Sequence, residues 1–402
     1  MALGSREAAE AMEGVLYHQY PHPGIPDFGC LDSQLENSFR RAEAVVAAAR
    51  QLQRRGFAPD VSVVHSAWGE ALHLQKVWPD CRWIAYPEIY GSPACLGYGF
   101  CRPLEQLSPQ EAQRIDRQNL LATAALTTYE AAVVPTQFQR GTFPPRLQPL
   151  LRVIHEGVAL EKIPTGPAQP LTLPDGTVLR RKTPLVTYTS RALEPLRGAD
   201  IFLKALPPLL HAHPTVQVVL VGALGSAYGS EAPGQEDAMA MRLQQLLASP
   251  LGSRIHWVER LPHPDLLALF RLSRAHTYLT YPYALSWSLL EAMACGAPVV
   301  GSRSAPVEEV IEERRNGLLV PFGDPGSLAA ALLDLLLQPT KAEQMGAAAR
   351  RTAEERFSLS QSVQAYEALF AQLLDRRTTG PGGPASVPPP PASPPGGAAA
   401  TT

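Results

Sequence analysis

Short apolar runs alternate with longer amphipathic stretches through the C-terminal half of the chain. A short apolar run between turn residues predicts a buried strand, whereas apolar positions three or four residues apart predict a helix. Strands are expected at 184–190, 216–222, 254–258, 277–280 and 298–301, and helices at 198–211, 265–274, 287–295, 307–314, 324–337, 341–355 and 359–374. This alternation predicts an α/β fold with a parallel, doubly wound sheet, which binds ligands at the carboxyl ends of its strands.

The N-terminal half shows a weaker form of the same alternation. Strands are expected at 14–20, 60–65, 82–86 and 131–135, helices at 36–55 and 109–128, and a strand leading into a linker at 151–158. At 402 residues the chain exceeds what one hydrophobic core usually supports. Two domains are therefore expected.

The stretch from Leu279 to Gly301 carries the most specific signal. It predicts a strand, a helix capped by Ser286, a left-handed exit at Gly296 and a second strand. A strand that feeds a helix N-terminus can form an anion site, because backbone N–H groups and the positive end of the helix dipole face the ligand. Glu291 would then accept hydrogen bonds from sugar hydroxyls beside the phosphates. The spacing fits equally well an ordinary αβ unit in which Glu291 is a solvated helix residue.

The runs SLLEAMACGAPVVG at 288–301 and NGLLVP at 316–321 resemble the C-terminal half of family 4 glycosyltransferases. That family has the GT-B fold, in which two Rossmann-like doubly wound domains face a cleft. The run LSWSLLE, which begins at 285, resembles a bacterial subset of the family. The resemblance implies that Glu291 binds the ribose of a nucleotide-sugar donor. Relatives carry another glutamate eight residues earlier, where this chain has Tyr283.

Two arginines follow the first expected strand of the C-terminal half. Arg191 is expected to leave that strand and Arg197 to open the next helix, so both can point into one crevice. In relatives an arginine and a lysine at this spacing bind the donor diphosphate. The resemblance therefore implies donor binding by Arg191 and Arg197, a catalytic role for Arg191, and further donor contacts from Leu285, Ser286 and Ser288. Guanidinium groups suit phosphate oxygens and can stabilise a leaving phosphate, but two surface arginines without a ligand are the alternative.

The expected strands at 60–65 and 82–86 end beside polar and aromatic residues, and both ends should face the cleft. His65 and Trp68 lie at the first end, and Trp68 would suit stacking on a sugar face. Glu88 follows the second, in the neighbourhood where many relatives place a histidine near the acceptor. We expect all three on the acceptor side, with Glu88 as a candidate catalytic base. A structural histidine and a non-catalytic loop carboxylate are the alternatives.

Bulk composition narrows the class of protein. Lys and Arg number 35 against 37 acidic residues, so no basic excess favours a nucleic-acid partner. The sequence has neither a membrane-span run nor a signal-peptide pattern, and five widely spaced cysteines favour a reducing compartment. We expect a cytoplasmic protein, with peripheral contact to the inner membrane face left open. The chain has no Asp-x-Asp dyad, which fits an enzyme that needs neither metal nor cofactor.

The predicted organisation has four parts. They are an acceptor-side domain at 1–157, a donor domain at 158–357, a helix at 358–376 that crosses back toward the first domain, and a disordered Pro/Gly/Ala tail at 377–402. In relatives the N-terminal sheet begins with a strand, a glycine-rich turn, a helix and a second strand, and nothing similar precedes Gly14. We therefore expect an N-terminal domain truncated at its start, with a rebuilt domain as the alternative.

Together these features predict a metal-independent glycosyltransferase of the hexosyltransferase type. It would move a sugar from a nucleotide-diphosphate donor to a glycan or lipid-linked acceptor, in the biosynthesis of cell-surface polysaccharide or glycoconjugates. Retention of the sugar's configuration is implied by the resemblance alone. Two alternatives stay open: a sugar-nucleotide epimerase of the same fold, and a nucleotide-sugar-binding or assembly subunit that has lost turnover. Tyr283 and the missing strands favour the second.

Overall fold

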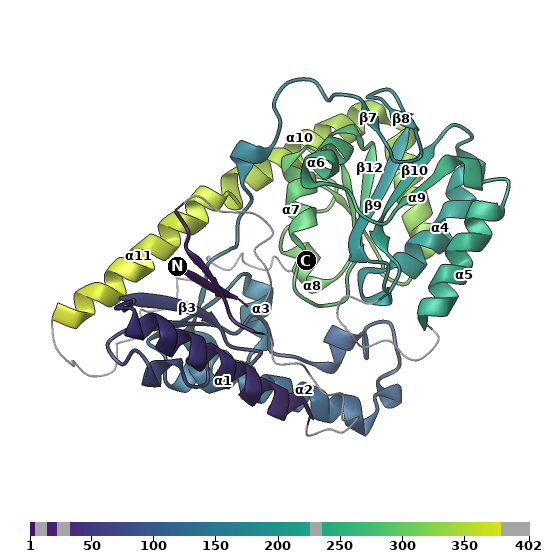
Figure 1. Cartoon of the computed structure of the whole chain (residues 1–402). Helices are drawn as coiled ribbons and strands as arrows, with labels where there is room; N and C mark the ends of the chain where they lie inside the picture. The colour runs from purple at the N-terminus through teal and green to yellow at the C-terminus, as the bar shows by residue number, and fades with distance from the viewer. Residues whose placement is uncertain (5–13, 22–32, 226–234, 379–402) are drawn as a thin grey trace, which may run out of the picture.

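Two parallel sheets, one in each half of the chain, organise the molecule. The computed structural model describes residues 1–4, 14–21, 33–225 and 235–378. In Figure 1 the N-terminal half forms the lower lobe and the C-terminal half the upper right lobe, while the last helix runs from one to the other. The predicted α/β architecture of two Rossmann-like domains is confirmed.

The C-terminal sheet has six parallel strands in the order β11-β10-β9-β12-β13-β14. They are β9 (Leu185–Ala192), β10 (Gln217–Ala223), β11 (Ile255–Val258), β12 (Ala275–Tyr278), β13 (Val299–Ser302) and β14 (Leu318–Val320). The order grows outward in both directions from the neighbours β9 and β12, so the winding reverses between them. Such a switch point leaves a crevice outside the carboxyl ends of the two strands, where doubly wound sheets bind ligands.

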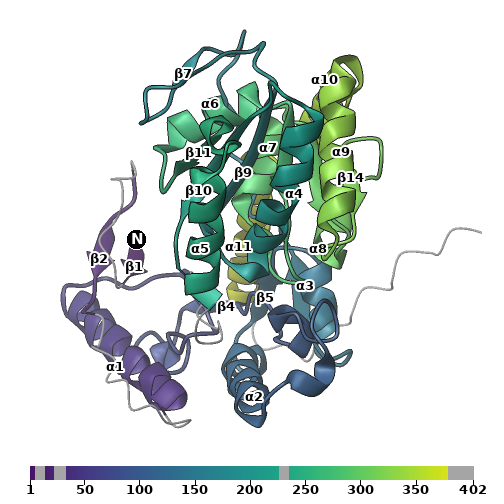
Figure 2. The same cartoon turned by 90° about the vertical axis from the view of Figure 1, so that its right-hand side faces the viewer.

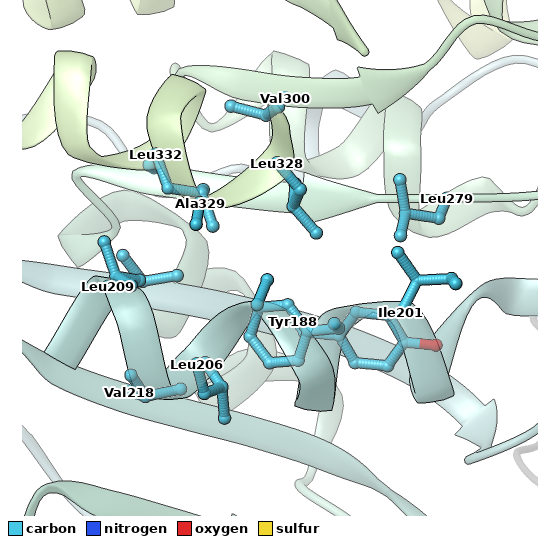
Figure 3. Packing of buried hydrophobic residues seen from close by; sticks show 14 of the residues in the cluster. Tyr188, Ile201, Leu206, Leu209, Val218, Leu279, Val300, Leu328, Ala329 and Leu332 are labelled. Carbon is cyan, nitrogen blue, oxygen red and sulfur yellow. The ribbon is translucent and has the colours of Figure 1, made fainter. Parts of the chain in front are cut away.

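Helices cover both faces of this sheet. The helices of the C-terminal half are α4 (Ala199–Ala212), α5 (Gln235–Ala248), α6 (His263–Leu272), α7 (Trp287–Ala294), α8 (Ala305–Glu308), α9 (Pro325–Leu337), α10 (Pro339–Arg356) and α11 (Leu359–Thr378). One buried cluster joins α4 and α9 to Tyr188 and Val300 of the sheet (Figure 3). A second joins α6, α7 and α10 to Val299. Successive strand residues point to opposite faces, so the two clusters form the two layers of the core.

The N-terminal sheet is parallel and has the order β3-β4-β5-β6. Its strands are β3 (Val61–His65), β4 (Arg82–Tyr86), β5 (Ala131–Val134) and β6 (Leu151–Val153), and its helices are α1 (Ser33–Arg54), α2 (Pro109–Ala124) and α3 (Gln137–Thr142). A separate parallel pair consists of β1 (Ala2–Gly4) and β2 (Tyr17–Gln19) (Figure 2). The short β1 precedes Gly14, and because residues 5–13 lie outside the described ranges, the predicted absence of a strand, glycine-rich turn, helix and second strand at the start of this domain stays a prediction. The strand expected at 14–20 shrinks to β2.

The chain passes between the two lobes twice at one place. The backbone N–H of Val158 donates to the carbonyl of Phe357 at 2.7 Å, and the N–H of Leu359 donates back to the carbonyl of Val158 at 2.8 Å. Beyond this crossing, α11 buries Leu369 and Leu373 in a cluster with residues of the N-terminal sheet. We propose that the domain boundaries lie at this double crossing, in agreement with the boundaries predicted from the sequence after residues 157 and 357.

Further contacts join the lobes. The ring of Phe100, from the N-terminal half, lies with its centroid 5.5 Å from that of Phe322 and 6.3 Å from that of Tyr281. The carboxylate of Glu309 accepts the first two backbone N–H groups of α3, at 2.8 and 2.7 Å. A carboxylate is favourable at a helix N-terminus because it satisfies unpaired donors and opposes the helix dipole. The relative position of the lobes is thus fixed by an aromatic contact and a cap as well as by the crossing.

One predicted helix, at 307–314, is wrong over most of its length. The structure has only the short α8 there, which ends at Glu308. Arg314 adopts a left-handed φ of 63°, and the Asn316 side chain accepts the N–H of Glu312 at 2.7 Å. Asparagine side chains offer the backbone an alternative to helical hydrogen bonds, so a side-chain-stabilised turn replaces the helix.

Other differences concern short or terminal segments. The helices α3 and α5 and the antiparallel hairpin of β7 (Leu171–Thr172) and β8 (Val178–Leu179) were not predicted. The last helix continues to Thr378, past the predicted start of the tail at 377, and the rest of the predicted tail lies outside the described residues. Within the described ranges, no helix combines the length and the apolar character needed to cross a bilayer.

Candidate functional site

A small pocket lies at the switch point of the C-terminal sheet, beside the carboxyl ends of β9 and β12. Its volume is about 60 Å³. Its lining comes from β9, from the turn after β9, from the end of β12 and from the residue before α7: Tyr188, Thr189, Ser190, Arg191, Arg197, Tyr278, Leu279 and Ser286. The structure thus brings three predicted donor residues, Arg191, Arg197 and Ser286, to the place where this fold class binds ligands.

Arg191 projects from the end of β9, which continues to Ala192 rather than ending before the arginine as predicted. Its side chain is exposed and lines the pocket. The hydroxyl of Thr189, buried in the same pocket, has no hydrogen-bond partner among the residues that the structure describes. Because an unsatisfied buried hydroxyl is costly, the pocket favours a ligand that carries oxygen atoms.

Arg197 is held in place by the protein. It is 5% exposed, and its Nη1 donates to Thr280 Oγ1 at 2.8 Å, to the carbonyl of Ala284 at 3.1 Å and to the Tyr278 hydroxyl at 3.4 Å. Its guanidinium carbon lies 5.9 Å from the centroid of the Tyr283 ring. The tyrosine that stands where relatives have a carboxylate therefore contacts this cation. Arg197 supplies a fixed positive charge at the pocket wall.

Two glycines with left-handed backbone conformations shape the turns around the pocket. Arg197 ends a short 3-10 turn and does not open the next helix, because Gly198 takes a left-handed φ of 66° before α4 begins. A side chain at Gly198 would lie 2.6 Å from Leu279 Cβ, so the turn can pack tightly under the pocket. Gly296 has φ of 76° and confirms the predicted left-handed exit from α7.

Ser286 caps α7 as predicted. Its φ and ψ of −84° and 144° are extended, and its Oγ accepts the N–H of Ser288 at 3.3 Å. The N–H of Ser286 donates to the Tyr278 hydroxyl at 2.7 Å. Two backbone donors expected to face a ligand are thus bound to protein oxygens. The Leu285 side chain packs against the apolar cluster beneath, whereas Trp287 is 63% exposed.

Glu291 does not line the pocket. Its carboxylate lies 2.7 Å from Nε2 of His263, the first residue of α6, and its side chain is 18% exposed. It lies five positions after Ser286, so at 3.6 residues per turn the two point to different sides of α7. The role of Glu291 in ribose binding stays a prediction, and the structure adds His263 as its partner.

The predicted acceptor-side residues form a second group. His65 ends β3, and its Nε2 lies 3.2 Å from Glu88 Oε2. The rings of His65 and Trp68 are stacked with centroids 6.1 Å apart, and Trp68 is 48% exposed. Glu88 has a φ of 60°, in the left-handed region that non-glycine residues rarely adopt. Strain of this kind concentrates at functional sites, which supports a role for Glu88.

Glu156 links the two groups, and the sequence did not indicate it. Its carboxylate accepts the Tyr86 hydroxyl at 2.6 Å and the indole N–H of Trp287. Tyr86 is the last residue of β4, and its ring lies 5.8 Å from that of His65. Burial, and then the charge of Glu156, raise the pKa of Tyr86 far above its usual value, so this phenol stays a donor. Glu156 therefore joins the acceptor-side group to the start of α7.

Two further pocket residues were not predicted from the sequence. The Tyr278 hydroxyl bridges Arg197 and Ser286, and Thr189 presents its buried hydroxyl to the pocket. Their place at the carboxyl ends of β12 and β9 was the signal available, because such positions line the crevice of a doubly wound sheet. Within the ranges that the structure covers, no group of three or more His, Cys, Asp or Glu residues is arranged to hold a metal ion.

Comparison with solved structures identifies the fold of this chain. The structure superposes on sucrose-phosphate synthase of Thermosynechococcus elongatus with a TM-score of 0.65 and 19% identity, over 89% of this chain and 83% of that one. It also matches HepE of Anabaena in complex with UDP-glucose, with a TM-score of 0.63 and 17% identity, over 88% and 86% of the two chains. At such low identity these matches show the fold alone, which is GT-B.

Sequence relatives match in part. The D-inositol 3-phosphate glycosyltransferase of Corynebacterium jeikeium is 32% identical over 194 residues, which are 48% of this chain and 44% of the relative. A GDP-mannose-dependent alpha-(1-6)-phosphatidylinositol monomannoside mannosyltransferase of Mycolicibacterium smegmatis is 31% identical over 212 residues, 48% and 52% of the two chains. The chain thus spans about half the length of the curated relatives it matches.

Family models cover both halves of the chain. The model of the glycosyl transferase family 4 group matches residues 1–163, and that of glycosyl transferases group 1 matches residues 176–352. The chain belongs to the family 4, group 1 glycosyltransferases. The resemblance inferred from the runs at 288–301 and 316–321 is confirmed.

Proposed function

We propose that this protein is a glycosyltransferase that takes its sugar from a nucleotide-diphosphate donor. The observation that carries the proposal is the convergence of Arg191, Arg197 and Ser286 on one pocket at the switch point of the C-terminal sheet. A departing nucleoside diphosphate gains negative charge, and fixed cations nearby stabilise that charge without reorganisation. In this proposal Arg191 contacts the phosphates directly, and the buried Arg197 supplies a permanent positive electrostatic potential.

The acceptor-side group fits the other half of such a reaction. An acceptor hydroxyl must lose its proton as it attacks the sugar, and Glu88 offers a carboxylate for this transfer beside His65. Trp68 offers an exposed aromatic face for a sugar ring. We propose retention of configuration and independence from metal on the strength of family membership.

Relatives support a narrower proposal about substrates. One is named as dependent on GDP-mannose with a phosphatidylinositol mannoside acceptor, and HepE was solved with UDP-glucose. We propose hexosyl transfer from a nucleotide-diphosphate sugar to a glycan or lipid-linked acceptor in the cytoplasm, with contact to the inner membrane face when the acceptor is a lipid. The cell-surface glycan pathway is part of the same proposal.

A second candidate is a subunit that binds the donor without turnover. The specific observation for it is Tyr283, whose ring lies against the Arg197 guanidinium where relatives hold a carboxylate. On this alternative the donor pocket is intact, but one carboxylate beside the donor sugar is absent. Donor binding without transfer distinguishes it from the enzyme.

The test has two stages. Thermal-shift screening against UDP, GDP and ADP and their sugars should show stabilisation by one nucleotide family, and no shift with any of them would contradict the donor assignment. Release of the nucleoside diphosphate and formation of a glycosylated product are then measured with glycan and lipid-linked acceptors. Glu88→Gln should keep the thermal shift and lose product, whereas Glu105→Gln, an exposed carboxylate outside the site, should keep both. Binding without product by the unmodified chain would favour the second candidate.

A further inference from the structure

A second pocket lies at the opposite end of the C-terminal sheet, beside the amino ends of its strands. Arg274 and Pro298, which line it, directly precede β12 and β13, and Gly296 lies just beyond the end of α7. The remaining walls come from the segment before β7, from the end of α6 and from α10. In Figure 1 the labels of α6, α10 and β7 gather at the end of this domain that points away from the N-terminal lobe. The pocket is therefore distinct from the donor site.

The size of this pocket suits a small ligand. Its volume is about 280 Å³, just below the roughly 300–1,000 Å³ range typical of small-molecule sites. The Ser273 hydroxyl in its wall is bonded to Thr187 Oγ1 at 2.7 Å inside the domain. Recognition in the pocket therefore falls mainly to its charged side chains.

Four arginines line the pocket: Arg181, Arg271, Arg274 and Arg350. Among the described residues of its wall, Glu343 is the one carboxylate. It lies 3.1 Å from Arg274 and 4.0 Å from Arg181. One carboxylate cannot neutralise four guanidinium groups, so the wall carries a positive surplus.

The other two arginines reach into the pocket without a carboxylate from its wall. Arg271 donates to the neutral carbonyl of Gly166, and Arg350 pairs along its own helix with Glu354 at 2.7 Å. Burial, and then the charge of Glu291, raise the pKa of the Cys295 thiol to about 12, while the charges of Arg271 and Arg350 act to lower it. Both guanidinium groups are thus close enough to influence one atom in the pocket wall.

A structural explanation accounts for only part of this cluster. Cations are favoured where helices end, because the last carbonyls carry partial negative charge. That explains Arg271 and Arg274, which lie at the end of α6. It does not explain Arg181, which follows the β7–β8 hairpin, or Arg350, which lies well inside α10. Arginines from three separate elements converge on one cavity.

We propose that this pocket is a binding site for a small phosphoryl anion. Guanidinium groups present paired N–H donors that match phosphate oxygens, and several of them together hold an anion with more than one negative charge. The pocket faces the C-terminal end of α7, whose N-terminal end borders the donor pocket. Binding here is independent of the proposed transferase reaction.

The test is isothermal titration of the full chain with inorganic pyrophosphate at constant ionic strength. The double variant Arg181→Gln/Arg350→Gln removes two partly exposed arginines, with side chains 67% and 39% exposed, so its fold should persist. Its affinity should fall by about tenfold or more, the factor that hydrogen bonds to charged groups contribute. Arg315→Gln, an exposed arginine paired with Glu312 elsewhere, is the matched control and should bind as the unmodified chain does.

Pyrophosphate also resembles the donor's diphosphate, so the donor pocket needs its own variant. Arg191→Gln should leave pyrophosphate binding at the four-arginine pocket unchanged, whereas the double variant should weaken it. The proposal is overturned if the unmodified chain binds no pyrophosphate, if the double variant binds as tightly as the control, or if Arg191→Gln alone abolishes all binding. The first two results do not bear on whether nucleotides bind at the switch point, whereas the third would assign the bound pyrophosphate to that pocket.

Discussion

Arg191 and Arg197 should respond differently to the same substitution. Arg191 is exposed at the end of β9, so Arg191→Gln should change the free energy of unfolding by no more than about 0.5 kcal/mol. Loss of a hydrogen bond to a charged group costs about 1.5–3 kcal/mol. At about 1.4 kcal/mol per factor of ten, the dissociation constant for the nucleoside diphosphate should rise about 10- to 150-fold.

Arg197→Gln should damage both binding and fold. Arg197 is 5% exposed and serves three acceptors, among them the carbonyl of Ala284 and the hydroxyl of Thr280. A shorter neutral side chain leaves buried acceptors unsatisfied, at about 1–3 kcal/mol each. We therefore expect a clear fall in melting temperature together with weaker nucleotide binding.

The assay is calorimetric titration with the nucleoside diphosphate that stabilises the unmodified chain most, paired with melting curves for each variant. Arg315→Gln again serves as the control for loss of a surface arginine. The reasoning is refuted if Arg191→Gln binds the nucleotide as tightly as the control. It is also refuted if Arg191→Gln loses as much thermal stability as Arg197→Gln, because the exposed position would then be structural.

Three further outcomes follow from the geometry. Glu156→Ala should lower the free energy of unfolding by about 1–3 kcal/mol, because it removes the acceptor of both the Tyr86 hydroxyl and the Trp287 indole N–H. Adding Tyr86→Phe should cost little more, because its hydrogen bond is already lost; fully additive losses in urea unfolding would contradict this. Burial lowers the pKa of His276 from 6.5 to about 3, so the unfolded chain takes up this proton at higher pH than the folded chain. The free energy of unfolding should therefore decrease as pH falls below 6.5, by about 2 kcal/mol at about pH 5. For His276→Gln the free energy of unfolding should depend less steeply on pH, and an unchanged pH dependence would refute the role of His276. Gly97 has a φ of 87°, and a Cβ there would lie 2.7 Å from the Tyr281 ring. Gly97→Val should therefore disturb the contact between the lobes and speed proteolysis between them, while nucleotide binding persists. An unchanged cleavage pattern would count against the importance of this contact.

Sequence reasoning succeeded where a few adjacent residues determine the structure. The cap at Ser286 and the left-handed exit at Gly296 follow from local turn chemistry, and both were predicted. The alternation of strands and helices likewise predicted the doubly wound sheet, and with it the crevice that receives Arg191 and Arg197. These features depend on residues that are close together in the sequence, so they could be predicted without knowledge of tertiary contacts.

The rest depends on contacts between distant residues. Glu156 and Trp287 are separated by 131 positions, and no periodicity in the sequence marks such a pair. The pairing of Glu291 with His263 spans two helices in the same way. The turn at Arg314 replaced a predicted helix because the Asn316 side chain competes with helical hydrogen bonding, an effect that apolar spacing does not show.

The placement of α11 has a consequence for the order in which the lobes mature during synthesis. Ile84 and Val133 of the N-terminal sheet are fully buried against a cluster that includes Leu369 and Leu373. Domains usually fold as they emerge, the first-made before the later ones. Here the first-made sheet cannot cover one face until α11 has left the ribosome, whereas the C-terminal sheet can close earlier. Nascent chains that stall before α11 would therefore expose an apolar surface, and the N-terminal lobe should be the last part to become native.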